Sequence, residues 1–236
     1  MRKGYVLVPG AGMSDWVWNK IIPLLKYESF SIPRRLKINN IENRLTATFT
    51  DVLNYANEII DETGFDEVVL VCHSGAGLIG GTLGKLNPKI KHIVFIAANI
   101  PRSGETAISV FPEEIQNKNI EAIKAQASSD YIPMKKLEQQ FRNYFCNTCT
   151  EEDVSYILEQ EFIPEPICVI TEKVDWTDFP EKGMTYIACT QDKTLTIENQ
   201  EFLASNLNIK EIKRISSDHL VMISHPTELA TVLNEL

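Results

Sequence analysis

A serine between a buried apolar run and an amphipathic stretch is the residue of this chain best placed for nucleophilic chemistry. The run Val68–Val71 is followed by Cys72-His73-Ser74-Gly75-Ala76, which has the pattern small-x-Ser-x-small. A serine at such a strand–helix join sits on a sharp turn that needs small neighbours, because the two backbones nearly touch. The helix behind Ser74 directs free N–H groups and its positive dipole end at a developing oxyanion. The pattern predicts a nucleophile; an ordinary turn with a capping serine is the alternative.

A serine nucleophile needs a histidine base, and the chain has four histidines. We select His219, because it lies in the loop after the predicted strand 211–215, at the end of the sheet where the nucleophile sits. The other three are less suited. His73 adjoins the nucleophile but should point away, His92 starts a strand at the opposite end of the sheet, and His225 precedes the last helix, where we expect a cap.

The carboxylate that orients the base should follow the end of another strand. Asp192 lies in the loop after the predicted strand 184–188, at its carboxyl end, although it could instead cap the following helix. Asp218 adjoins the base, and a direct neighbour rarely reaches the ring in good geometry. Two other aspartates belong to an inserted segment, Asp175 and Asp178. The sequence therefore predicts that Ser74, Asp192 and His219 act together.

The oxyanion formed by such a nucleophile needs backbone N–H donors. Gly75 supplies one, as the residue after the nucleophile. The second is expected from the loop Pro9-Gly10-Ala11-Gly12 after the first strand, with Ala11 as the best candidate. A nucleotide-phosphate turn is the alternative for this loop, but it lacks the third glycine of GxGxxG and no P-loop lysine follows.

Short β-branched runs that alternate with longer amphipathic stretches must position these loops. Such alternation is typical of a parallel sheet covered by helices on both faces, here of about six strands. The clearest predicted strands are 5–8, 68–71, 93–96, 184–188 and 211–215, and the clearest predicted helices are 15–27, 46–61, the stretch after Ser74, 197–207 and the stretch from Pro226. Thr48 and Asp51 predict a capping box in the second of these helices.

A segment without a convincing strand interrupts this alternation from about residue 103 to residue 180. It contains three predicted helices, 113–126, 134–145 and 151–161, the last with a capping box from Thr150 and Asp153. We predict an α/β core from 1–102 and 181–236 and a helical cap insertion from 103–180. The cap would cover the site, where open α/β sheets bind ligands. Its large apolar side chains could line a pocket or could instead pack in the core: Phe111, Ile115, Leu137, Phe141, Tyr144 and Phe145.

Composition and charge narrow the class of protein. The 236 residues are 44% hydrophobic and 23% charged, which is typical of a globular domain. A net charge of −9 argues against nucleic acid and anionic membranes as partners. No apolar stretch approaches a membrane span, and Met1–Gly4 enters a strand pattern without a signal peptide. We therefore expect a cytoplasmic protein.

The lone CxxC at Cys146 and Cys149 has no second pair or nearby histidine for zinc.

With these positions assigned, the chain resembles the α/β-hydrolase superfamily, whose members have the chain order serine, acid, histidine. Within it, the chain is similar to the small esterases that include plant salicylate and jasmonate methylesterases, hydroxynitrile lyases and bacterial relatives. The matching stretches cover nearly the whole chain: Val6–Ala11 with Trp16-Val17-Trp18, Ala97–Glu105, Tyr186–Asp192 with Gln200, and Ser217-Asp218-His219 with Ser224-His225-Pro226.

At two positions this chain differs from the hydroxynitrile lyases of the group, and both differences argue against cyanohydrin cleavage. Hydroxynitrile lyases of the group have a lysine after the catalytic histidine and a threonine in the opening loop, where this chain has Leu220 and Gly10. The prediction is a serine hydrolase that cleaves a small-molecule carboxylic ester without metal or cofactor, and a homodimer is one assembly that the sequence permits. The alternatives are lyase-like chemistry at the same site, or a ligand-binding protein on a hydrolase scaffold.

Overall fold

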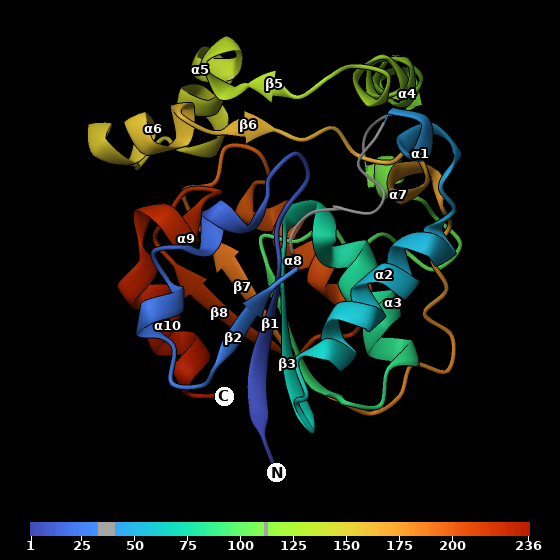
Figure 1. The fold of residues 1–236 in the computed structure, drawn as a ribbon, viewed down its shortest axis with the longest axis vertical. Helices are drawn as coiled ribbons and strands as arrows, with labels where there is room; N and C mark the ends of the chain where they lie inside the picture. Colours follow the sequence, from blue (N-terminus) through green and yellow to red (C-terminus); the bar gives the residue numbers. More distant parts are fainter. Residues whose placement is uncertain (33–40, 111–112) are drawn as a thin grey trace.

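A parallel sheet of six strands forms the centre of the protein (Figure 1). The computed structural model describes residues 1–32, 41–110 and 113–236. The strand order is β2-β1-β3-β4-β7-β8, and the strands are β1 (Lys3–Val8), β2 (Ser29–Ser31), β3 (Glu67–His73), β4 (Ile90–Ile96), β7 (Gly183–Cys189) and β8 (Glu211–Ile215). All five strand pairs of this sheet are parallel. The predicted fold class is confirmed.

Alternate side chains of the strands enter two separate apolar cores, one on each face of the sheet. Val6 and Val8 of β1 pack with α2 (Phe49–Glu62), α3 (Gly77–Leu86) and α8 (Ile197–Ser205). Tyr5 and Leu7 pack into the other core. That core includes side chains of three helices: η1 (Asp15–Trp18), α9 (Val221–Ser224) and α10 (Pro226–Asn234). Because both faces are covered, the central strands contain continuous apolar runs instead of an alternating pattern.

The strand order reverses direction between β1 and β3. From β1 the chain first moves outward to β2 and then crosses to β3 on the other side of β1. A crevice forms at the carboxyl ends of two strands whose connections leave in opposite directions. The loop Pro9–Gly12 and η3 (Ser74–Ala76) both start at this point. The topology thus brings the two predicted oxyanion donors to one place.

The predicted helices agree with the structure in most of the core. The capping box of α2 is present, with the Thr48 side chain accepting from the Asp51 N–H, and α10 begins with Pro226. The single helix predicted over 15–27 is wrong, since this stretch forms two short 3₁₀ turns, η1 and η2 (Ile22–Leu24). Pro23 has no amide hydrogen to continue a helix. Strand β2 was not predicted, because three residues are too few to show the hydrophobic pattern of a strand.

The helices between β4 and β7 lie above the carboxyl ends of the strands in Figure 1, and the chain then descends beside α3 to reach β7. We call residues 103–180 the helical segment. Its elements are η4 (Ala107–Val110), α4 (Glu113–Ala127), β5 (Ile132–Pro133), η5 (Met134–Leu137), α5 (Glu138–Gln140), η6 (Phe141–Phe145, a π-helix), α6 (Glu151–Leu158), β6 (Glu161–Phe162) and α7 (Cys168–Thr171). A further helix, α1 (Ile41–Thr46), packs against α4. The capping box predicted for α6 is present.

Two predictions for the helical segment need correction. The helix predicted over 151–161 ends at Leu158, and the stretch expected to contain no strand holds β5 and β6, which pair antiparallel. Strands of two residues have no periodicity that a sequence pattern could reveal. The helix predicted over 134–145 is continuous but changes from 3₁₀ through α to π geometry. None of the helices in the described ranges is long and apolar enough to cross a membrane.

Candidate active site

Ser74 lies on the sharp turn between β3 and η3 with a backbone φ of 51°. A positive φ is strained for a residue with a side chain, and the Asn99 N–H supports it by donating to the Ser74 carbonyl oxygen over 2.9 Å. The surrounding backbones are very close. A Cβ at Gly75 would lie 3.1 Å from the Ala11 Cβ, and one at Gly77 would lie 2.3 Å from the Asn99 carbonyl oxygen. These contacts require the small residues around Ser74.

Cys72 occupies the position where a glycine is usual in this kind of turn. Its side chain is fully buried between β3 and α3. The space for its sulfur comes from Gly80, because a Cβ at Gly80 would lie 2.3 Å from the Cys72 Sγ and 3.0 Å from its Cβ. Burial raises the pKa of the Cys72 thiol, so this thiol stays protonated and is a poor nucleophile.

Replacing Gly80 with alanine should therefore destabilise the protein by about 1–3 kcal/mol through overpacking. Alanine is a better helix former than glycine, so the same substitution at an exposed helix position would stabilise the protein. Urea unfolding of G80A, C72G and the double variant measures the coupling between the two sites. The double variant should recover most of the loss caused by G80A. A G80A protein that is as stable as the original would contradict the packing argument.

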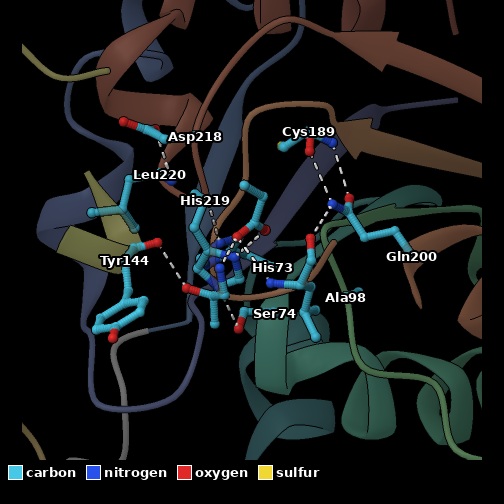
Figure 2. Close-up of polar contacts among 12 residues, drawn as sticks. His73, Ser74, Ala98, Tyr144, Cys189, Gln200, Asp218, His219 and Leu220 are labelled. Carbon is cyan, nitrogen blue, oxygen red and sulfur yellow. Dashed lines mark hydrogen bonds and ion pairs between the residues drawn. The ribbon is translucent and has the colours of Figure 1, made fainter. Parts of the chain in front are cut away.

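The three side chains selected from the sequence meet in a continuous hydrogen-bonded chain. The His219 Nε2 lies 2.8 Å from the Ser74 Oγ, and its Nδ1 lies 2.6 Å from the Asp192 Oδ2. The side chains of His219 and Asp192 are both completely buried. Because a carboxylate accepts, the Nδ1 carries the proton and the Nε2 is left to accept from the serine hydroxyl. Figure 2 shows His219 next to Ser74 at this junction.

The carboxylate of Asp192 is held by the loop that it begins. Its Oδ1 accepts from the Thr194 N–H over 2.6 Å and from the Leu195 N–H over 3.0 Å, which leaves Oδ2 for the histidine. Gln200 on α8 anchors this loop to β7. Its fully buried side-chain amide accepts from the Cys189 N–H and donates to the Cys189 carbonyl oxygen (Figure 2). The same amide donates to the Leu195 carbonyl oxygen.

The backbone around His219 is held by two side chains to which the sequence assigned no role. The buried Asp218 carboxylate accepts from the Thr148 N–H, the Leu220 N–H and the Ser224 hydroxyl over 2.9–3.1 Å, so it faces away from the ring. The His73 Nε2–H donates to the His219 carbonyl oxygen over 2.9 Å. Adjacency in sequence gave no sign of either role, because both depend on contacts between distant loops.

The remaining histidines lie apart from Ser74. His92 contacts the Thr185 hydroxyl within the sheet. His225 occupies the N-cap position of α10, but its ring bonds the Ser224 hydroxyl and does not cap the helix. Among the described residues, no group of three or more His, Cys, Asp or Glu side chains is arranged to hold a metal ion.

The two predicted oxyanion donors lie side by side. A Cβ on Gly75 would be 3.4 Å from the Ala11 backbone nitrogen, and one on Gly10 would be 3.0 Å from the Ser74 Cβ. The loop after β1 therefore packs directly on the turn that holds the serine. The two predicted donor residues, Ala11 and Gly75, therefore come from two different strand ends and line the same cavity as Ser74.

A cavity of about 200 Å³ opens beside Ser74, Ala11 and Gly75. Its wall is mainly apolar, from Ala107, Ile108, Ile123, Val169, Ile170 and Leu195, with three polar side chains, Asn99, Glu165 and Thr194. The pocket lining predicted from the sequence is wrong for Leu137, Phe141, Tyr144 and Phe145, which do not line this cavity. Phe145 instead packs its ring against His219, with centroids 5.4 Å apart. Phe111 and the Ile115 side chain lie outside the described residues.

The model of the alpha/beta hydrolase family matches residues 5–232 of this chain. Salicylic acid-binding protein 2 of Nicotiana tabacum is 26% identical over 257 residues, with 99% of this chain and 96% of that protein covered. Polyneuridine aldehyde esterase of Rauvolfia serpentina is 26% identical over 265 residues, with 100% and 96% covered. Norfluorocurarine synthase 1 of Strychnos nux-vomica is 25% identical over 261 residues, with 100% and 95% covered.

The same fold occurs in solved structures. An extracellular α/β-hydrolase from a Paenibacillus species superposes with a TM-score of 0.79 at 20% identity, over 98% of both chains. The fold, the serine turn and the family match together show that this chain belongs to the alpha/beta hydrolase family. Its relatives include methylesterases and an esterase, so hydrolase activity is supported in general terms.

Proposed function

We propose that this chain is a carboxylesterase-type serine hydrolase that cleaves small carboxylic esters through an acyl-enzyme. The single observation that carries the proposal is the continuous contact from Ser74 through His219 to Asp192, at 2.8 and 2.6 Å. Either distance is within the range that proton transfer requires.

In the proposed mechanism the Ser74 Oγ attacks the ester carbonyl while the His219 Nε2 takes its proton. Asp192 holds the imidazole in the required tautomer and stabilises its charged form. The N–H groups of Ala11 and Gly75 donate to the oxyanion, and one such donor contributes about 3 kcal/mol to transition-state stabilisation. His219 then protonates the departing alcohol. Water attacks the acyl-serine in the same way, which releases the carboxylic acid and restores the Ser74 hydroxyl.

The apolar cavity is proposed to hold the acyl or alcohol group, and the helical segment 103–180 is proposed to act as its cap. A cavity of about 200 Å³ is smaller than those that enclose drug-sized ligands. This volume favours an ester with a small acyl or alcohol group.

A series of p-nitrophenyl esters tests this proposal. We expect turnover of the acetate through the hexanoate and a steep fall for the decanoate, because a long acyl chain exceeds the cavity. Release of p-nitrophenol at several substrate concentrations gives kcat/KM for each ester. Absence of turnover for the whole series would overturn the proposal, and an optimum at the decanoate would contradict the size argument.

A ligand-binding protein is the second candidate, because one relative is named for binding salicylic acid. Saturable binding of small aromatic acids without ester turnover would select this candidate.

The cytoplasmic location and the homodimer stay predictions from the sequence.

A further inference from the structure

The loop that supplies Ala11 is a tight turn whose central peptide has two available orientations. The Met13 N–H donates to the Gly10 carbonyl oxygen over 3.2 Å, which closes a four-residue turn. Gly12, in the third position, has a φ of 74°, a combination typical of a type II turn. Rotation of the peptide between Ala11 and Gly12 would convert such a turn to type I. Ala11 is joined to Gly12 through this central peptide, so a displacement of Gly12 would also shift Ala11 and its N–H.

The helical segment holds the two peptides on either side of the Gly12 Cα through Phe162, Ile163 and Glu165. The Glu165 Oε1 accepts from the Gly12 N–H over 3.1 Å in a buried contact. The Ile163 N–H donates to the Gly12 carbonyl oxygen over 2.9 Å. The Phe162 ring fills the space at Gly12, where an added Cβ would lie 1.9 Å from a ring carbon. Both hydrogen-bonding groups of Gly12 are therefore engaged by residues more than a hundred positions away in sequence.

Glu165 is built into this position. It is 6% exposed and lies between Pro164 and Pro166, which restrict the backbone on both sides. It lines the same cavity as Ser74 and Ala11. A carboxylate facing an oxyanion site opposes the developing negative charge, so its charge is not what the reaction needs. Glu165 instead contributes the acceptor oxygen for the Gly12 N–H.

We propose that Glu165 is a positioning residue of the oxyanion hole, which fixes the turn Gly10–Met13 and thereby aims the Ala11 N–H at the reacting carbonyl. This inference rests on the proposed esterase function. It assigns part of the oxyanion hole to the helical segment, so that the segment orients the reacting centre as well as enclosing the substrate.

Three variants test the inference: Glu165→Ala, Glu165→Gln and Glu161→Ala. Glu161 is an exposed glutamate of β6 and serves as the matched control. We expect Glu165→Ala to lower kcat by about 10- to 100-fold, because small misplacements of a reacting group have effects of this size. The KM should change by less than about threefold, since the cavity wall is otherwise intact. Glu165→Gln should recover most of the lost kcat, because its amide oxygen can still accept from Gly12.

A second measurement reports on the turn itself. In protein labelled with 15N-glycine, the Gly12 amide should exchange with solvent faster in Glu165→Ala than in Glu165→Gln. A kcat in Glu165→Ala equal to that of Glu161→Ala, with ester turnover intact, would overturn this inference alone. Equal losses in the Ala and Gln variants would also overturn it, because the acceptor oxygen would then not matter. Absence of turnover that depends on Ser74 in the unaltered protein would overturn the proposed function and this inference with it.

Discussion

Replacing Ser74 with alanine should lower kcat for p-nitrophenyl acetate by about 10⁵-fold. The methyl group leaves nothing to attack the carbonyl, whereas the cavity and the N–H groups of Ala11 and Gly75 remain. The substrate should still bind, and the residual rate of the variant comes from substrate binding and oxyanion stabilisation. The KM should therefore change little, and steady-state kinetics over a range of ester concentrations measures both constants.

Ser205→Ala is the matched control for this experiment. Ser205 is an exposed serine at the end of α8 whose hydroxyl donates to the Phe202 carbonyl oxygen, and it does not line the cavity. Its variant should retain the full rate. A Ser74→Ala protein that loses less than about tenfold in kcat would exclude a serine nucleophile.

Replacing Asp192 with asparagine should lower kcat by about 10⁴-fold through the wrong histidine tautomer. The two backbone N–H groups of Thr194 and Leu195 hold the oxygen on one side of the group, so the amide nitrogen of the variant faces the His219 Nδ1. Two donors cannot face each other, and the ring proton therefore moves to Nε2. That nitrogen can then no longer accept the proton of Ser74.

Asp175→Asn separates this effect from a general loss of charge. Asp175 is an exposed aspartate of the helical segment that pairs with Lys85, and its variant should keep its activity. Circular dichroism and thermal unfolding should show that Asp192→Asn remains folded. A fall of less than about tenfold in a folded Asp192→Asn protein would contradict the assigned role, and attention would move to Asp218.

Much of the fold follows from local patterns that the structure preserves. The runs Tyr5–Val8, Val68–Cys72 and Ile93–Ile96 are apolar because both faces of the sheet are covered, and this signal does not depend on distant contacts. The box formed by Thr48 and Asp51 is equally local. The placement of Asp192 and His219 needed one further rule, that the carboxyl ends of parallel strands lie on one edge.

Several of the parts that sequence patterns missed depend on long-range contacts. The run 15–27 reads as one helix, but three of its four buried residues, Trp16, Val17 and Trp18, are consecutive, which a single amphipathic face cannot accommodate. The cavity wall combines α4, α7 and the loop after β7, so no single stretch reveals it. The contact of Glu165 with Gly12 is of the same kind.

The most direct test of the account is the mass of the protein after reaction with a fluorophosphonate, followed by peptide mapping of the adduct. A fluorophosphonate is attacked by an activated serine and loses fluoride, which leaves a stable phosphonyl ester. The account predicts one adduct per chain, located on Ser74, and none in Ser74→Ala. An intact protein that hydrolyses esters but stays unmodified at Ser74, or is modified at another residue instead, would contradict it.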